Sequence, residues 1–369
     1  MDTPENWIAN AVEKIKKTSI KHPKFLAAHD ELYEVLNAAE AGEVVVLVGP
    51  SRVGKSRLQG LMKSRMAKEA TDADAEIPLR PWVGLTATND AVHAKFKTKP
   101  FICDALIVIQ HPIYGAPLKE GDLGIERAAR FEKTSEPTLR QAFERGLQVN
   151  RTRFLSVDEA HHVGHAEGGA ATASQILDSW KCLAFKNQLV LVLVGAYPIL
   201  NVMQLSTHMI GRELMVHFPR YRIDDKADRA SFAAILKTYD EVIKLAPEIG
   251  SLTTQLDFLM RVTLGCVGHL SNLLRRALAT CKAQKAEALT LKHLESAAHK
   301  VDQLHELLKE IQDGEHFMQR DAAADCNSHD VDDPEAAPLA SPATTQKKIR
   351  ASKRPFQAKQ RNRPSVPRL

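Results

Sequence analysis

Long apolar runs and paired cysteines are both missing from this 369-residue sequence. Its longest apolar run, residues 189–199, is broken by Gly195 and Pro198 and falls short of the roughly 18–20 residues that a membrane-spanning helix needs. The N-terminus is acidic and no apolar segment follows it, so we expect neither a signal peptide nor a membrane protein. The five cysteines form no CxxC pair. This favours reduced thiols in a cytoplasmic protein over a disulfide framework or a zinc site.

Charge is distributed unevenly along the C-terminal part of the chain, although the formal net charge is only +5. Residues 321–335 contain acids but no Lys or Arg, whereas residues 340–369 contain Lys and Arg but no acid. Repeated prolines and few large apolar residues accompany this change. Such a segment cannot bury enough surface to offset its ordering entropy. We therefore predict a disordered tail over residues 313–369, acidic and then basic.

Strand and helix patterns alternate over the first two thirds of the chain. A continuous apolar run at 44–48 is typical of a parallel strand covered on both faces. Two further strands are expected at 153–157, where Ser156 interrupts the apolar residues, and at 189–194. A strand at 82–85, close to two prolines, is expected at a sheet edge. After a last strand at 214–218 the pattern is wholly helical, up to a helix expected over 290–311. The sequence thus predicts the following domains: an N-terminal helical segment (1–40), an α/β core with a parallel sheet (41–222) and a small helical lid (223–312).

A phosphate-binding motif follows the strand at 44–48. Residues 49–56 match G-x-x-x-x-G-K-[ST] without mismatch. In such a loop the backbone N–H groups surround the phosphates, Lys55 reaches the β- and γ-phosphates, and the Ser56 hydroxyl binds Mg²⁺. A chance match is the alternative, and the flanking strand and helix argue against it. We predict that the nucleotide contacts are Gly49, Pro50, Ser51, Arg52, Val53, Gly54, Lys55, Ser56 and Arg57.

Two acids, Asp158 and Glu159, come directly after the strand at 153–157. Asp158 is suited to hold Mg²⁺, and Glu159 to polarise the water that attacks the γ-phosphate. Such a pair can also simply begin a helix. Together with the P-loop it predicts Mg²⁺-dependent hydrolysis of ATP.

The acidic pair also belongs to the tetrapeptide Asp-Glu-Ala-His at 158–161, a signature of one helicase group. Those helicases need a second motor domain, and too few residues follow the core to form one. His161, His162 and His165 are conceivable metal ligands. Without Cys partners, we expect them to be solvated or structural.

Residues that would sense the γ-phosphate depart from the usual pattern of P-loop ATPases. At the end of the strand at 189–194, where Asn, Thr or Ser is usual, the sequence has Ala196, which leaves Tyr197 or a backbone group. Arg212, in the turn before the strand at 214–218, is suited to reach the ATP of a neighbouring subunit. Arg220 and Arg222 compete for that role, and a solvated surface charge is the alternative for each of them.

With these elements in order, the chain resembles the AAA+ ATPases, and more narrowly the TniB/TnsC-type transposition regulators, with MuB a more distant relative. The resemblance covers roughly residues 20–305. It rests on the ATP motifs and on four flanking segments, residues 22–25 (His-Pro-Lys-Phe), 209–213 (Met-Ile-Gly-Arg-Glu), 218–221 (Phe-Pro-Arg-Tyr) and 264–270 (Leu-Gly-Cys-Val-Gly-His-Leu).

The residues that match the family's ATP positions are Lys55, Ser56, Asp158 and Glu159. Arg212 matches the approximate position of the family's trans-acting arginine. AAA+ proteins commonly carry a sensor arginine at the start of a lid helix. This sequence has Gly268-His269 there, so that arginine is missing or displaced to Arg275 or Arg276.

The resemblance implies a homo-oligomer, a ring or a filament, that assembles on double-stranded DNA when ATP is bound. It would link a target-selector protein to a transposase and leave DNA after hydrolysis. Lys95, Lys97 and Lys99 are candidates for contacts with DNA phosphates, the alternative being a solvated basic loop. The basic tail would hold DNA or dock on the transposase, and a localisation signal is a further option.

Two other functions stay open. One is an AAA+ ATPase with another client, such as a replication loader or a secretion-associated ATPase. The other is a signalling switch in which ATP exchange gates an appended module, and we expect no such module after residue 312.

Overall fold

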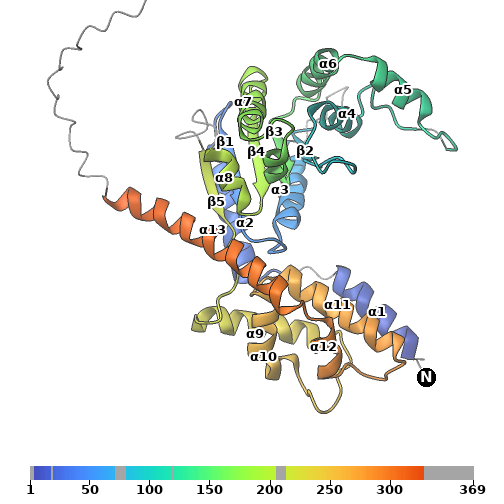
Figure 1. Ribbon diagram of the computed structural model, residues 1–369, viewed down its shortest axis with the longest axis vertical. Coiled ribbons are helices and arrows are strands. Elements are labelled where there is room, and N and C mark those ends of the chain that lie inside the picture. The colour runs from blue at the N-terminus through green and yellow to red at the C-terminus, as the bar shows by residue number, and fades with distance from the viewer. Residues whose placement is uncertain (1–3, 18–19, 71–79, 119, 205–212, 328–369) are drawn as a thin grey trace, which may run out of the picture. The chain divides into compact units, whose positions relative to one another are not determined.

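The computed structural model describes residues 4–17, 20–70, 80–118, 120–204 and 213–327 (Figure 1). Residues 1–321 form one compact unit and residues 322–369 a second. The helices that follow one another up to residue 204 are α1 (Pro4–Lys17), α2 (Pro23–Ala38), α3 (Lys55–Glu69), α4 (Thr98–Val108), α5 (Ile125–Lys133), α6 (Glu136–Val149), η1 (Ala160–His165), α7 (Ala170–Lys186) and α8 (Pro198–Gln204). Those that follow are α9 (Lys226–Asp240), η2 (Leu252–Gln255), α10 (Leu256–Thr263), α11 (Val267–Ala283), α12 (Leu291–Ala297) and α13 (Val301–Asn327). Within the described ranges, no helix is long and apolar enough to cross a membrane.

Five strands form one parallel sheet in the order β2-β3-β4-β1-β5. Their bounds are β1 (Val44–Val48), β2 (Trp82–Thr86), β3 (Phe154–Asp158), β4 (Val190–Gly195) and β5 (Glu213–His217). The α/β fold class predicted from the sequence is therefore confirmed, and so is the edge position of β2. The carboxyl ends of β1, β3 and β4 meet at one edge of the sheet, where ligands bind in open parallel sheets.

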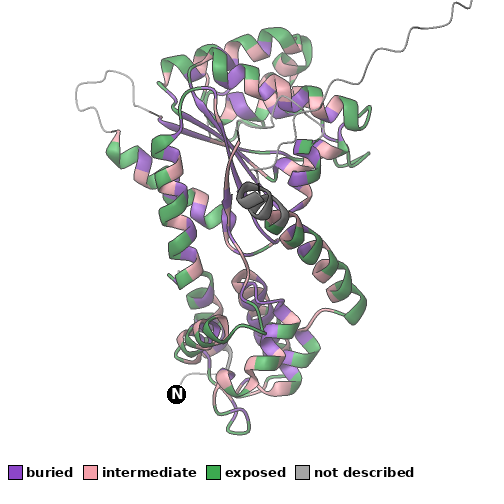
Figure 2. Cartoon of the chain, turned by 90° about the vertical axis from the view of Figure 1, so that its left-hand side faces the viewer, coloured by how far each residue is buried: buried purple, intermediate pink, exposed green. Residues whose placement is uncertain are grey.

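Both faces of the sheet are covered, which explains why its strands are apolar throughout (Figure 2). Successive strand residues point to opposite faces. In β1, residues 44, 46 and 48 pack with α4, α6 and α7, whereas residues 45 and 47 pack with α2 and α3. All five residues of β1 are fully buried.

A separate apolar cluster forms the helical lid from α9, α10, α11 and α12. Helix α1 joins this cluster through Ile8, Ala11 and Ile15, whereas α2 packs on the sheet through Phe25 and Leu32. The two helices of the predicted N-terminal segment therefore pack on different parts of the protein. The single helix expected over 290–311 is instead two helices, α12 and α13.

Helix α13 runs well beyond the predicted end of the lid. It continues to Asn327 through residues 313–327, so the predicted start of the disordered tail at residue 313 is wrong. The physical reason is an apolar stripe at helical spacing that packs against the core of the sheet. This stripe consists of Leu304, Leu307, Leu308, Ile311, Phe317 and Met318. The rest of the predicted tail, from residue 328 onward, lies outside the described residues.

Residues 88–130, which gave no clear pattern in sequence, contain α4 and the start of α5. The apolar stretch at 101–109 is helical and packs against α6. Its buried side chains are Phe101, Ala105, Leu106 and Ile109.

Candidate nucleotide site at the P-loop

The P-loop, residues 49–56, joins α3 to strand β1, which lies between β4 and β5 in the sheet. Helix α3 begins at Lys55, so its first backbone N–H groups are available to an anion held by the loop. The loop leaves β1 tightly against the end of β5, because a Cβ at Gly49 would lie 2.2 Å from the carbonyl oxygen of Phe218. The predicted strand–loop–helix context of the motif is therefore present.

Lys55 is a buried cation in the middle of this loop. Its side chain is 8% exposed, and its Nζ donates to the carbonyl oxygens of Gly49 and Pro50 at 2.8 Å each. Burial lowers the pKa of Lys55 to about 8, and the nearby charge of Glu159 opposes that shift. A phosphate group would restore the charged ammonium by giving it a full anionic partner. The site therefore fits an anionic ligand.

Ser56 and Asp158 lie together although more than a hundred residues separate them in sequence. The Ser56 hydroxyl donates to Asp158 Oδ2 at 2.8 Å, and the backbone N–H of Glu159 donates to Asp158 Oδ1 at 2.9 Å. Hydroxyl and carboxylate oxygens are the ligands that Mg²⁺ takes in proteins, usually with several waters. The donor set therefore fits Mg²⁺, and its role in holding the metal stays a prediction.

Glu159 occupies a strained backbone position at the start of η1. Its φ of 53° lies in the left-handed region, which costs a residue with a Cβ about 1–2 kcal/mol. Strain of this kind is found at sites where the backbone must present a functional group.

His161 lies close to Glu159, a placement that the sequence argument missed. The distance from its Nδ1 to Glu159 Oε2 is 3.3 Å. Burial lowers the pKa of His161 to about 4, so the ring is neutral at pH 7. Its Nδ1 also lies at the end of β4, 3.6 Å from where a Cβ on Gly195 would be. The Asp-Glu-Ala-His pattern was the available signal for this residue.

The two other histidines of this segment connect η1 to the loop after β2. His162 Nδ1 lies 2.8 Å from the carbonyl oxygen of Ala87, and His165 Nδ1 lies 3.2 Å from Asn89 Nδ2.

A cavity of about 280 Å³ lies beside the P-loop, between the start of α2 and the lid helix α11. The lid reaches the loop through backbone atoms, because the N–H of Gly268 donates to the carbonyl oxygen of Arg52 at 2.9 Å. Arg275 also lines this cavity, which makes it the better placed of the two displaced lid arginines that were considered. A nucleotide with its phosphates on the P-loop would have its base and ribose on this side.

His22 lines the cavity and contacts Tyr221 behind it. The N–H of Phe25 and the hydroxyl of Tyr221 both approach His22 Nδ1, at 3.2 and 2.9 Å. Burial lowers the pKa of His22 to about 4, and the charge of Lys24 adds to this effect. A neutral ring with an unprotonated Nδ1 accepts both hydrogen bonds.

The described residues that were considered as sensors have hydrogen-bond or ion-pair partners within the protein itself. Tyr197 and His217 form a hydrogen bond between Oη and Nε2 at 2.9 Å, at the ends of β4 and β5. Arg220 forms a two-pronged ion pair with Glu315 of α13, and Arg222 pairs with Asp224 at 2.8 Å. The predicted trans-acting residue, Arg212, lies outside the described residues.

The predicted DNA-contacting lysines occupy the segment between β2 and α4. Lys97 Nζ lies 2.7 Å from Asp90 Oδ2, and Lys99 Nζ donates to the carbonyl oxygen of Glu132 at 3.1 Å. Lys95 is exposed. Two of the three lysines thus have intramolecular partners, and their contact with DNA stays a prediction.

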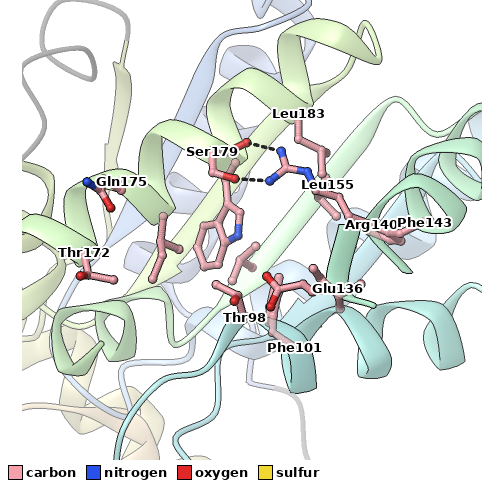
Figure 3. Close-up of a pocket in the computed structure, with 14 residues that line it drawn as sticks. Thr98, Phe101, Glu136, Arg140, Phe143, Leu155, Thr172, Gln175, Ser179 and Leu183 are labelled. Atoms are coloured by element: carbon pink, nitrogen blue, oxygen red, sulfur yellow. Dashed lines mark hydrogen bonds between the residues drawn. The ribbon is translucent and has the colours of Figure 1, made fainter. Parts of the chain in front are cut away.

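A second, smaller cavity of about 140 Å³ lies on the face of the sheet that carries α4, α6 and α7 (Figure 3). Trp180 stacks on Phe101 there, with ring centroids 5.0 Å apart. Arg140 of α6 donates to the hydroxyl of Ser179 and, at 3.0 Å, to its carbonyl oxygen (Figure 3). These contacts tie α6 to α7 in the core.

Comparison with known proteins finds chains of similar fold among the solved structures. No family model matches the sequence, and no curated protein matches it. The Walker-type ATPase PABY2304 of Pyrococcus abyssi is 15% identical, with a TM-score of 0.46, over 81% of this chain and 76% of that one. The ORC2 protein of Aeropyrum pernix is 15% identical over 77% and 70%, with a TM-score of 0.47. Cdc6p from Pyrobaculum aerophilum is 13% identical over 76% and 67%, with a TM-score of 0.48. Identities and scores of this size transfer no ligand, partner or activity to this chain.

The fold and the site together define the class of protein. A parallel sheet with a P-loop after β1 and an acidic pair at the end of β3 is the core of a P-loop nucleotide-binding protein. A helical lid that contacts the P-loop follows this core, as predicted from the sequence. The narrower similarity to transposition regulators stays a prediction.

Proposed function

We propose that this protein is a Mg²⁺-dependent ATPase that works as an ATP-controlled switch on double-stranded DNA and regulates transposition. One observation carries the proposal. Three of the segments on which the family resemblance rests meet around the nucleotide cavity. His22 lies 5.4 Å from Tyr221 and 6.2 Å from Phe218, between ring centroids, and the N–H of Tyr221 donates to the carbonyl oxygen of Gly265. Such a junction makes the position of the lid depend on the nucleotide.

The chemistry proposed for the site follows from its own residues. Lys55 would turn from the loop carbonyls to the β- and γ-phosphates, where it offsets charge in the transition state. Ser56 and Asp158 would hold Mg²⁺, which when bound neutralises phosphate charge. Glu159 would orient the attacking water, and the neutral His161 ring lies beside the Glu159 carboxylate.

The proposed switch uses the contact between lid and loop. Because Gly268 and Arg52 are in backbone contact, a nucleotide that reshapes the P-loop also moves α11 and the α1 helix packed on it. Moving the lid would change the surface offered to a second copy of the chain. In that assembly we assign Arg212 to the ATP of the neighbouring subunit and the segment of Lys95, Lys97 and Lys99 to DNA phosphates.

The test is ATP-dependent association with duplex DNA. Lys55→Ala should abolish nucleotide binding and with it the DNA association that Mg²⁺–ATPγS supports. Lys63→Ala, on the exposed side of the same helix, is the matched control and should behave as wild type. Electron microscopy of the wild-type complex should show rings or filaments on DNA. DNA binding that is unchanged by Lys55→Ala would refute the ATP switch.

The transposition assignment needs its own measurement. A transposase encoded beside this protein should bind it and should insert DNA preferentially where the protein has assembled. Assembly on DNA with no effect on such a transposase would leave the ATP switch standing and refute the assignment to transposition.

A further inference from the structure

Two carboxylates, Glu310 and Glu315, border the side of α13 that packs against the core of the sheet. Glu310 and Glu315 are separated by five residues, about 7.5 Å along the helix axis. Ile311 and Gly314 lie between them on the same face, and both are buried. This face lies against the core of the sheet, where Ile311 belongs to the main apolar cluster.

Gly314 fixes how closely α13 approaches the core. A Cβ at this position would lie 2.1 Å from Cγ of Tyr197, so any other residue would push the helix away. A glycine inside a helix costs about 1 kcal/mol relative to alanine, a cost that close backbone packing explains. Tyr197 is the residue directly after the usual sensor position at the end of β4.

The Glu315 carboxylate contacts the Arg220 guanidinium, and the Glu310 carboxylate lies within electrostatic range of Lys55. Glu315 accepts hydrogen bonds from Arg220 at 2.9 and 3.1 Å, and the two side chains are only 16% and 13% exposed. Burial raises the pKa of Glu310, and the charge of Lys55 opposes that rise. Burial raises the pKa of the Cys266 thiol, and the charges of Arg220, Lys55 and Glu315 have smaller effects on it. The Arg220–Glu315 ion pair lies two residues after Phe218, whose carbonyl oxygen packs against Gly49 of the P-loop.

Arg220 is also linked to the junction of core and lid. Its carbonyl oxygen accepts a hydrogen bond from Lys24 Nζ at 2.6 Å, and its neighbour Tyr221 contacts both His22 and Gly265. If the Arg220 side chain changed its partner, the contacts on both sides of the nucleotide cavity would therefore change as well.

We propose that Arg220 distinguishes a nucleoside triphosphate from a diphosphate in this protein, and that Glu315 occupies it until a terminal phosphate competes for it. The inference deepens the proposed function, since it rests on ATP binding at the P-loop. A terminal phosphate held by Lys55 has the same charge sign as Glu310 and Glu315, so it repels the acidic face while attracting Arg220. When Arg220 binds the phosphate in place of Glu315, α13 would lose this ion pair and would pack less tightly on the core.

Nucleotide affinities of the full-length protein test this inference without DNA. Glu315→Gln should bind Mg²⁺–ATPγS about fivefold more tightly, a gain of about 1 kcal/mol, because Arg220 is no longer occupied. The affinity for Mg²⁺–ADP should change less than twofold. Gly314→Ala should act in the same direction, because it displaces α13 while leaving both charges in place. Glu306→Gln, on the exposed side of the same helix, is the control and should leave both affinities unchanged.

Arg220→Gln distinguishes loss of phosphate recognition from loss of α13 docking. Like Glu315→Gln it breaks the ion pair, but it also removes the guanidinium that would bind the terminal phosphate. The preference for ATPγS over ADP should therefore fall below that of wild type. Hydrogen exchange of residues 304–318 in the wild-type protein should increase with ATPγS and not with ADP. Equal effects of Glu315→Gln on both nucleotides, or unchanged affinities with a lowered melting temperature, would overturn the proposal. Loss of DNA assembly with the nucleotide effects intact would instead count against the proposed function alone.

Discussion

The contact between Gly268 and Arg52 makes the lid sensitive to a single methyl group. A Cβ at Gly268 would lie 2.3 Å from the carbonyl oxygen of Arg52, 3.1 Å from its carbonyl carbon and 3.1 Å from its Cβ. Two of these atoms belong to the backbone of the P-loop, so rotating a side chain cannot relieve the clash. The start of α11 would have to move by roughly 1 Å, and overpacking of this kind costs about 1–3 kcal/mol.

We expect Gly268→Ala to weaken nucleotide binding by about 5- to 150-fold, which is the same free energy expressed as an affinity ratio. Isothermal titration with Mg²⁺–ATPγS measures it, and thermal unfolding without nucleotide shows whether the strain is already present in the free protein. Gly60→Ala in α3 is the control, because nothing lies within 4 Å of a Cβ there. If Gly268→Ala bound ATPγS as wild type does, the lid contact would have no part in nucleotide binding.

Two further predictions concern hydrolysis and pH. Glu159→Gln should retain ATPγS affinity within about twofold and lower ATP turnover by about 10²-fold or more, measured by phosphate release, because general acid–base catalysis contributes that much. DNA complexes formed with ATP should then persist longer, and faster dissociation than wild type would contradict the role of Glu159. His22 has a folded pKa of about 4, below its ordinary value of 6.5, so its contribution to stability is complete above pH 6.5 and is lost as the pH falls toward 4. Denaturant unfolding at pH 7 and pH 4.5 should show a loss of at most about 3 kcal/mol from this residue, and His22→Asn, which keeps an acceptor but cannot titrate, should show a smaller pH dependence. An identical dependence in both proteins would rule out His22 as its source.

The parts of the fold that could be predicted from sequence are those in which neighbouring residues determine the outcome. The P-loop needs its glycines, Lys55 and Ser56 in consecutive order, because one turn must supply both the N–H groups and the helix start. Largely apolar runs predicted β1, β3 and β4, since a strand buried on both faces favours apolar residues, and Ser156 of β3 is a polar exception. Asp158 and Glu159 were found for the same reason, at the end of such a run.

The features that escaped prediction depend on contacts between distant segments. Nothing near residue 314 in sequence shows that a glycine there faces Tyr197, more than a hundred positions earlier. The association of α1 with the lid likewise depends on α11. His161 was treated as one of a group of loop histidines, because its closeness to Glu159 and the end of β4 follows from the 3₁₀ turn η1 and not from spacing.

The backbone contact between the lid and the P-loop explains why the start of α11 has no arginine. An arginine side chain reads a phosphate at a distance and tolerates small movements of its helix. Here a backbone N–H donates directly to the P-loop, which requires Gly268 and leaves no space for a long side chain. The lid is thus coupled to the shape of the loop instead of the charge of the nucleotide. Sensing of charge then has to come from a residue other than those at the start of α11. Arg275 lines the cavity further along that helix, and we assign the sensing of charge to Arg220, whose partner Glu315 a phosphate can replace.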